Sequence, residues 1–253
     1  MTALRDFSAD DYRTDGFAGA FQVYSPELAA RAYDLFFRTL GQDPADPQPV
    51  PAESLGGWHY RHRWAYDLAV DPALLSHVRD VLGPDLVLWA MRFWYKPPRS
   101  GGYIPWHQDI HYWPMEPAIN ATAWVTLGVA NAGNGGLKII PGTHLANYGH
   151  VEVDRDDARL NKAVDPRHVD VGKAVQLDLQ PGQGLLFTER LFHGSERNDS
   201  EIARVAFSLR FTTPEVVFSE REDWEGLQVR TLLVSGEDRF GHNPSLRVDP
   251  PTA

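Results

Sequence analysis

The chain of 253 residues contains no cysteine. This absence excludes disulfide frameworks, zinc fingers and cysteine nucleophiles, and it fits a reducing cytoplasm, where we expect the protein to act. A long apolar run is also missing, because the longest charge-free stretch, residues 117–137, holds three asparagines and four glycines. Such a stretch does not span a membrane. The first eleven residues carry four charges and no apolar core, so we expect no signal peptide.

Positive charge is scarce relative to negative charge. Lys and Arg total 24 against 34 Asp and Glu, which gives a formal net charge of −10. An acidic surface argues against nucleic acid or an anionic membrane as the main partner, and favours a small-molecule substrate. Hydrophobic residues make up 43% and charged residues 23%, which is typical of a globular domain with a buried core.

Two segments in the first third of the chain have helical periodicity. In residues 26–40 apolar side chains recur at steps of three and four residues, and Ser25 stands in the N-cap position. Gly41 is expected to end this helix. A second helix is predicted over residues 72–82, with Asp71 as its cap.

After residue 83 the sequence changes to short apolar segments separated by glycine- and proline-rich turns. Such segments, without helices between them, are typical of a jelly roll or barrel and not of a parallel sheet. We predict a mainly β fold, a double-stranded β-helix (jelly roll, cupin-like) with flanking α-helices. Residues 1–253 are predicted to form a single domain, with an N-terminal helical region to about residue 83, a jelly-roll core over 84–215 and a C-terminal extension over 216–253. The predicted strands are residues 86–95, 122–130, 137–140, 175–179, 185–188 and 204–213.

The segment around His107 carries the first chemical signal. In a strand, residues i and i+2 face the same side, so His107 and Asp109 would converge while Gln108 faces away. His193, beside a glycine-flanked strand, is the candidate third ligand. Two histidines and one carboxylate on one face form a facial triad, which binds Fe(II) and leaves positions open for a cosubstrate and dioxygen. A His-x-Asp pair by itself also fits a histidine that is oriented by a nearby aspartate.

Arg204, eleven residues after His193, carries the second signal. An arginine that points into a barrel requires an anion, because burial of an unpaired guanidinium is costly. A dicarboxylate that chelates the metal at one end supplies that anion at the other, and a planar guanidinium binds a carboxylate bidentately. The alternative is a surface arginine at a strand end. One face of this strand would carry Arg204, Ala206, Ser208 and Arg210, and the other Val205, Phe207, Leu209 and Phe211.

Taken together, these residues make the sequence resemble the phytanoyl-CoA dioxygenase family of Fe(II)/2-oxoglutarate-dependent oxygenases. The resemblance extends over about half of the chain, and its motifs agree in order and spacing. The family fold is a distorted jelly roll, in agreement with the strand pattern. The matching segments are Lys96-Pro97-Pro98-Arg99-Ser100-Gly101, His107-Gln108-Asp109-Ile110-His111-Tyr112-Trp113-Pro114, Trp124, residues 133–144, His193-Gly194-Ser195-Glu196-Arg197-Asn198 and Arg204.

The resemblance implies a role for each matching residue. His107, Asp109 and His193 would bind the iron. Arg204 would hold the distal carboxylate of the cosubstrate 2-oxoglutarate, with the Ser195 hydroxyl beside it. The implied activity is that of a dioxygenase, which consumes O2 and 2-oxoglutarate while it oxidises a C–H bond of a second substrate by hydroxylation or a related reaction.

Other positions refine the comparison with the family. Trp124 matches a tryptophan that lines the 2-oxoglutarate pocket, and it equally suits the core side of a buried strand. A family lysine that reaches 2-oxoglutarate has no clear match, and residues 57–61 are the nearest stretch. Asp109 disfavours halogenation, which requires a small residue in place of the carboxylate. His111 and His144 are interpreted as neighbours of the site or capping residues, and not as ligands.

The substrate is inferred from side chains around the metal motif. Trp106, Tyr112 and Trp113 flank that motif and favour a small natural-product or saccharide intermediate of bacterial secondary metabolism. Ring oxidation in antibiotic biosynthesis, on an oligosaccharide, is the narrowest expectation. The acidic composition disfavours a coenzyme A thioester. Two alternatives stay open at this level: a metal-dependent hydrolase or isomerase, and a non-catalytic binding protein, each on a cupin-like barrel.

Overall fold

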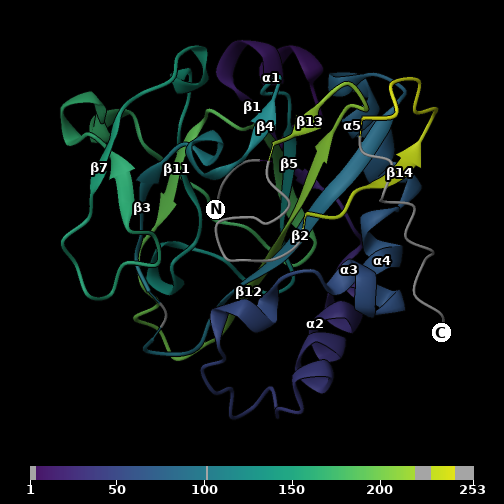
Figure 1. The fold of residues 1–253 in the computed structure, drawn as a ribbon. Helices are drawn as coiled ribbons and strands as arrows, with labels where there is room; N and C mark the ends of the chain where they lie inside the picture. The colour runs from purple at the N-terminus through teal and green to yellow at the C-terminus, as the bar shows by residue number, and fades with distance from the viewer. Residues whose placement is uncertain (1–3, 101, 220–228, 243–253) are drawn as a thin grey trace.

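Helices dominate the first third of the chain in the computed structural model, which describes residues 4–100, 102–219 and 229–242 (Figure 1). Both helices expected from periodicity are present with the predicted bounds, and further short helices accompany them. The α-helices are α1 (Ala9–Asp15), α2 (Pro26–Leu40), α3 (Trp58–Arg61), α4 (Arg63–Ala69) and α5 (Pro72–Leu82).

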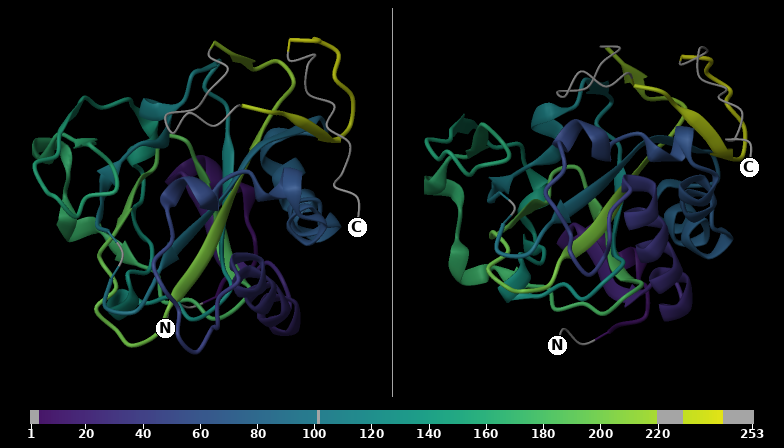
Figure 2. Two further views of the ribbon diagram at one scale, coloured as in Figure 1. Left: turned by 60° about the horizontal axis from the view of Figure 1, so that its bottom comes forward. Right: turned by 90° about the horizontal axis from the view of Figure 1, so that it is seen from below.

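Two antiparallel sheets form the double-stranded β-helix that the sequence predicts. The larger sheet has the order β1-β10-β5-β12-β2-β14 and the smaller one β3-β11-β6-β9. Helices α2 to α5 lie on one side of the larger sheet, and the smaller sheet lies on the other (Figures 1 and 2). The strands of the larger sheet are β1 (Phe17–Gln22), β10 (Gln183–Thr188), β5 (Ala121–Thr126), β12 (Arg204–Thr212), β2 (Leu86–Lys96) and β14 (Leu232–Ser235). Those of the smaller sheet are β3 (Ile104–His107), β11 (Phe192–Ser195), β6 (Lys138–Ile140) and β9 (Val175–Gln176). Two separate pairs are β4 (Met115–Glu116) with β13 (Val217–Phe218), and β7 (His150–Glu152) with β8 (Lys162–Val164).

The predicted caps confirm why the two long helices begin where they do. The Ser25 hydroxyl accepts a hydrogen bond from the backbone N–H of Leu28, 3.2 Å away, at the start of α2. The Asp71 carboxylate accepts from two backbone N–H groups of α5. Gly41 ends α2 with φ of 66°, a left-handed conformation that glycine adopts without strain.

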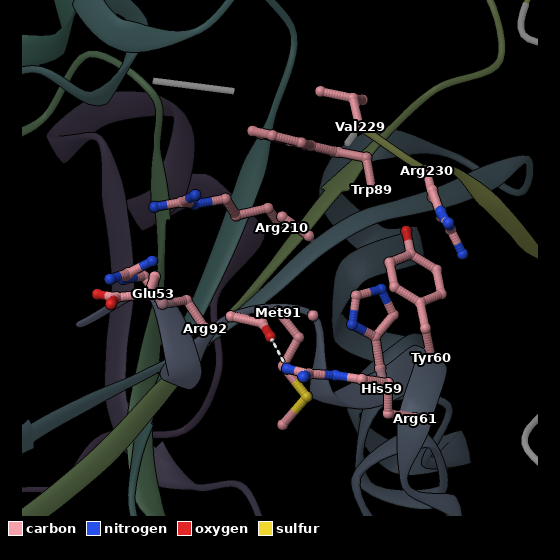
Figure 3. Close-up of a pocket in the computed structure, with 13 residues that line it drawn as sticks. Glu53, His59, Tyr60, Arg61, Trp89, Met91, Arg92, Arg210, Val229 and Arg230 are labelled. Carbon is pink, nitrogen blue, oxygen red and sulfur yellow. Dashed lines mark hydrogen bonds between the residues drawn. The ribbon is translucent and has the colours of Figure 1, made fainter. Parts of the chain in front are cut away.

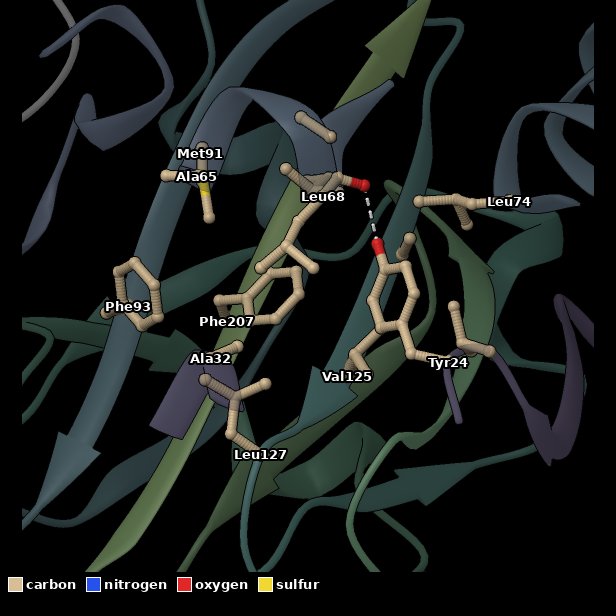
Figure 4. Packing of buried hydrophobic residues seen from close by; sticks show 14 of the residues in the cluster. Tyr24, Ala32, Ala65, Leu68, Leu74, Met91, Phe93, Val125, Leu127 and Phe207 are labelled. Carbon is tan, nitrogen blue, oxygen red and sulfur yellow. Dashed lines mark hydrogen bonds between the residues drawn. The ribbon is translucent and has the colours of Figure 1, made fainter. Parts of the chain in front are cut away.

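The main hydrophobic core lies between the helices and the larger sheet (Figure 4). Strand β12 shows the predicted alternation, because Phe207 and the other odd-numbered residues from 205 to 211 belong to this core. Ala32 of α2 and Phe93 of β2 pack into the same cluster, and the Tyr24 hydroxyl donates to the carbonyl of Leu68, 2.7 Å away. Complete burial of a phenylalanine side chain contributes about 1.5–3 kcal/mol. The even-numbered face of β12 is thereby left to point into the barrel.

Two strands of the larger sheet lie outside the stretch predicted to hold the barrel. Strand β1 pairs with β10 in the larger sheet, although the surrounding N-terminal region is mostly helical. Strand β14 of the predicted C-terminal extension pairs with β2, while residues 220–228 and 243–253 of that extension lie outside the described residues. Within the described part of the chain, every helix is too short or too polar to cross a bilayer.

Candidate metal centre and cosubstrate pocket

The two predicted histidine ligands lie on neighbouring strands of the smaller sheet. His107 ends β3, and His193 on β11 is its direct partner in the antiparallel ladder. Their ring centroids are 4.1 Å apart. The turn after β11 and the glycine at 194 bring the strands close enough for this pairing, because a Cβ at Gly194 would lie 2.8 Å from the carbonyl oxygen of Ile104.

Asp109 reaches the same point by a route that differs from the expected one. Strand β3 ends at His107, and Asp109 begins a 3₁₀ helix over Asp109–Tyr112. Gln108 between them keeps extended dihedral angles, φ −107° and ψ 128°, so the carboxylate still turns to the side of His107. Gln108 points away as predicted, and its amide donates to the carbonyls of Ala146 and Arg190 at 2.8 and 2.7 Å.

The three candidate ligand atoms lie within 4.8 Å of one another. Asp109 Oδ1 is 3.4 Å from His107 Nε2 and 3.7 Å from His193 Nε2. All three side chains are buried. A cation placed among them would be within reach of two imidazole nitrogens and one carboxylate oxygen, the donor set that suits Fe(II) in non-haem oxygenases.

Hydrogen bonds to the backbone fix the tautomer of both histidines. His107 Nδ1 lies 2.9 Å from the carbonyl oxygen of Pro105, and His193 Nδ1 lies 3.0 Å from that of Leu191. A carbonyl only accepts, so Nδ1 carries the proton in each ring and Nε2 presents its lone pair to the centre. This is how metal-binding histidines are oriented by their surroundings.

The charge states are also those of a metal site. Burial by itself raises the pKa of Asp109, but His193, His107 and Arg210 outweigh it and lower that pKa to about 2. Burial, followed by His107, lowers the pKa of His193 to about 4. A carboxylate and a neutral imidazole are therefore already present at neutral pH, and metal binding displaces no proton from either.

Arg204 lies in the same cavity as the triad, on the even-numbered face of β12. It is 1% exposed, and its Nη1 donates to the carbonyl of Trp94 at 2.7 Å. Its buried Nε has no hydrogen-bond partner among the described residues. Burial and the nearby Arg159 lower the pKa of Arg204 to about 9, so the guanidinium stays charged at neutral pH. A buried cation with an unused donor fits an anionic ligand.

Trp124 and Ser195 line this cavity as well, as the resemblance implies. The guanidinium carbon of Arg204 lies 5.9 Å from the centre of the Trp124 ring. Trp124 also packs in the hydrophobic cluster beneath the cavity, so it is at once a core and a lining residue. The sequence analysis places Lys96 in a matching segment but assigns it no role at the site. In the structure Lys96 is 3% exposed at the end of β2 and donates to the Ser195 hydroxyl, 2.8 Å away.

A larger cavity of about 320 Å³ lies beside the metal centre (Figure 3). Arg210 lines both cavities, so this residue marks where they meet. Trp89 forms part of the larger cavity because the register of β2 against β12 shifts between Ala90 and Leu88, which inserts an extra residue. Figure 3 shows the rings of His59 and Tyr60 side by side on α3, at the edge of this space.

Both α3 side chains bring unused polar atoms to the larger cavity. Neither ring nitrogen of His59 nor the hydroxyl of Tyr60 has a hydrogen-bond partner among the described residues, and these atoms are buried. Burial, followed by Arg61, lowers the pKa of His59 to about 3, so its ring is neutral. The lining of the cavity therefore combines these uncharged groups with the indole of Trp89 and with charged side chains, those of Glu53, Arg61, Arg92, Arg210 and Arg230.

The remaining sequence candidates lie outside both cavities. His111 stacks on His150 with ring centroids 4.0 Å apart, and His144 Nε2 lies 3.1 Å from the carbonyl of Arg13. Trp113 packs against Trp89 and the Arg210 guanidinium instead of lining the cavity itself. The tryptophan that lines the larger cavity is Trp89. Sequence spacing did not single it out, because a bulge and not periodicity directs it inward.

Known proteins are similar to this chain in sequence and in fold. A family model described as phytanoyl-CoA dioxygenase (PhyH) matches residues 12–206. Human peroxisomal phytanoyl-CoA dioxygenase is 29% identical over 150 residues, which cover 57% of this chain and 44% of the human protein. The chain spans about half the length of the curated relatives it matches.

Solved structures extend the similarity to nearly the whole chain. The apo form of the non-heme monooxygenase ThoJ matches with a TM-score of 0.78 and 27% identity, over 97% of this chain and 88% of ThoJ. CytC3 with Fe(II) and alpha-ketoglutarate (2-oxoglutarate) matches with a TM-score of 0.68 and 22% identity, over 95% and 93% of the two chains, and that likeness shows the fold. With the family match covering more than half of its residues, the chain belongs to the phytanoyl-CoA dioxygenase family, a family of Fe(II)/2-oxoglutarate-dependent oxygenases.

Proposed function

We propose that this protein is an Fe(II)/2-oxoglutarate-dependent dioxygenase in which His107, Asp109 and His193 bind the iron. Arg204 and Ser195 bind the distal carboxylate of 2-oxoglutarate in this proposal, and Trp124 forms a wall of the same pocket. The observation that carries it is the meeting of the triad and the Arg204 guanidinium in one buried cavity. A dicarboxylate cosubstrate accounts for a buried cation with an unused donor beside the triad.

The residues of the chain prepare this site before any ligand arrives. Backbone carbonyls hold both histidines with Nε2 toward the centre, and Asp109 is ionised. The guanidinium fixes the orientation of the dicarboxylate, so its 2-oxo acid end faces the triad. Iron, 2-oxoglutarate and O2 supply the oxidising chemistry when bound. The apolar walls around the triad exclude water from it.

The larger cavity is the proposed site of the second substrate. Its volume of about 320 Å³ lies at the lower end of the range for small-molecule sites, which is too little for a coenzyme A thioester to be enclosed. Trp89 offers an indole face, and His59 and Tyr60 offer hydrogen-bonding groups without charge. These groups suit a hydroxylated ring, so we propose a small natural-product or saccharide intermediate as substrate. Bacterial antibiotic biosynthesis is the proposed setting.

We also propose that the described residues act as one oxygenase domain. Strands β1 and β14, from opposite ends of the chain, join the same sheet as the central barrel strands. The helices of the first third cover that sheet and complete its core.

The decisive experiment adds Fe(II) and then 2-oxoglutarate to anaerobic protein and records the visible charge-transfer band of the iron chelate. We expect a band in the wild type and none in His107→Ala. The exposed His168 provides the matched control, because His168→Ala should keep the band. A folded wild type without a band would overturn the proposal in favour of a metal-dependent hydrolase or isomerase, or of a binding protein on the same barrel.

A further inference from the structure

Two buried basic side chains face each other at one end of the barrel. Lys96 of β2 and Arg204 of β12 are direct partners in the antiparallel ladder, and they are 3% and 1% exposed. Directly opposed like charges destabilise a sheet, and burial of both increases the cost. Such a pair is retained only where something at that place uses both charges.

The ammonium group of Lys96 is held in one position. It donates to Ser195 Oγ at 2.8 Å and to the carbonyl oxygen of Glu196. The stem of the side chain packs against the turn at Gly135, whose left-handed φ of 73° brings the backbone so close that a Cβ would lie 2.9 Å from Cδ of Lys96. The lysine thus has little freedom to point elsewhere.

The hydrogen bond from Lys96 determines which further hydrogen bonds the Ser195 hydroxyl can form. A serine hydroxyl has one proton to donate and two lone pairs that accept. Lys96 occupies a lone pair, and no acceptor for the proton is found among the described residues. Ser195 and Arg204 line the same cavity, so the proton is available to a ligand bound there.

The surroundings of Lys96 favour an anion in that cavity. Burial, followed by Arg204, Arg159 and Lys138, lowers the pKa of Lys96 to about 6, while Glu196 acts in the opposite direction. The Glu196 carboxylate is itself paired with Lys138 on the half-exposed rim. Without an anion, Lys96 is therefore largely uncharged at neutral pH, and a carboxylate bound in the pocket would favour its protonated form.

We propose that Lys96 is a positioning residue for the distal carboxylate of 2-oxoglutarate: it donates to the Ser195 oxygen, directs the serine proton to the carboxylate and adds its charge to that of Arg204. This inference rests on the proposed roles of Arg204 and Ser195. It gives the distal carboxylate two direct neighbours in the cavity, the Arg204 guanidinium and the Ser195 hydroxyl, and places the Lys96 amino group behind that hydroxyl.

The experiment compares two cosubstrate probes that differ only at the distal end. 2-Oxoglutarate carries the distal carboxylate, and 2-oxopentanoate has the same chain without it. Each is titrated anaerobically into the Fe(II)-loaded wild type and Lys96→Met, with the charge-transfer band as the signal. We expect the Kd for 2-oxoglutarate to rise about tenfold or more in the variant, as for loss of a charged hydrogen-bond network, and the Kd for 2-oxopentanoate to change less than twofold.

Further variants separate positioning from packing. Lys96→Arg should restore most of the preference for 2-oxoglutarate, and Lys173→Met, at an exposed ion pair with Asp170, should keep all of it. In a double-mutant cycle with Ser195→Ala, the two losses of 2-oxoglutarate affinity should be less than additive. One substitution removes the hydroxyl and the other removes the contact that orients it, so both abolish the same hydrogen bond to the carboxylate. Lys96→Gln provides a second test if Lys96→Met does not fold.

Three results would overturn the inference: equal weakening of both probes, an unchanged preference in a folded Lys96 variant, or full additivity with Ser195→Ala. Equal weakening of both probes would show that Lys96 contributes only to local packing. A wild type that gives no band with either probe would instead refute the proposed function itself, and the inference with it.

Discussion

Strand β12 carries two buried arginines on one face, and its two ends behave differently. At one end Arg204 is fixed by the Trp94 carbonyl and keeps an unused Nε at the narrow cavity that the triad also lines. At the other end the Arg210 guanidinium lies 5.5 and 4.7 Å from the ring centres of Trp89 and Trp113, where a cavity of about 320 Å³ begins. The cavity at the first end is narrow, and the cavity at the second end is wide.

The difference separates the two tasks of an oxygenase. A cosubstrate that never varies is best held by a rigid, enclosed pocket on strands, where hydrogen bonds set each donor in advance. The proposed site of the second substrate is lined in part by helix α3 and by Val229 and Arg230, which lie outside the central strands. Side chains on such peripheral segments change without loss of the barrel. We infer that the Arg204 end defines the reaction class and the Arg210 end the substrate.

Removal of a proposed metal ligand should have the largest effect, because the proposed roles of both ends of β12 depend on bound iron. His107→Ala should lower Fe(II) affinity by more than about 100-fold, because loss of even an outer partner of a metal ligand costs 10–100-fold. The anaerobic charge-transfer band measures this. Retention of the band at wild-type iron concentrations would show that His107 is not a ligand.

Arg204→Ala tests the narrow end alone. We expect the Kd for 2-oxoglutarate to rise by about 100-fold, the scale of a lost bidentate charged contact, while Fe(II) still binds. Titration of the band with 2-oxoglutarate measures the change. The surface variant Arg63→Ala is the control, because Arg63 pairs with Asp67 on the exposed side of α4. An unchanged Kd would remove Arg204 from the cosubstrate site.

His59→Phe tests the wide end. It replaces two buried nitrogens that have no partner among the described residues by an apolar ring, so we expect a stabilisation of about 1 kcal/mol. In a chain of this size that corresponds to a rise in Tm of about 2–4 °C. The Kd for 2-oxoglutarate should stay within twofold of the wild type. A large fall in 2-oxoglutarate affinity would show that the two ends are not independent.

An effect on stability, separate from ligand binding, is expected from Lys96 as pH changes. Burial and Arg204 lower its pKa to about 6 in the folded protein, against about 10.4 in an unfolded chain. Between these values the unfolded chain binds more protons, so the free energy of unfolding rises with pH. The Tm of the wild type should therefore fall relative to Lys96→Met between about pH 9.5 and about pH 6.5, without cosubstrate. A constant difference in thermal melts would contradict the assigned pKa.

The elements that the sequence predicted best are those whose signals are local. Helices α2 and α5 were expected with their caps, because periodicity and capping depend on neighbouring residues only. Strand β12 was expected with its two faces for the same reason. Strand β1 was missed, because a six-residue segment at a sheet edge acquires its conformation from β10, which is more than 150 residues away.

The predictions for the candidate site show the same difference between local signals and long-range geometry. The identity and order of His107, Asp109, His193 and Arg204 were legible in the sequence, because the donor atoms that iron and a carboxylate require belong to few residue types. Their convergence was correct in outcome but not in detail, since Asp109 reaches the centre from a 3₁₀ turn.

The sequence by itself determined the barrel class and named the three candidate ligands and the candidate anion-binding arginine, because these follow from residue type, spacing and alternation. Only the tertiary structure decided that Lys96 faces Arg204 across two strands, that a bulge turns Trp89 inward and that α3 carries His59 to the larger cavity. These placements depend on which distant strands pair and in what register, and pairing energy is gained only when the whole sheet assembles.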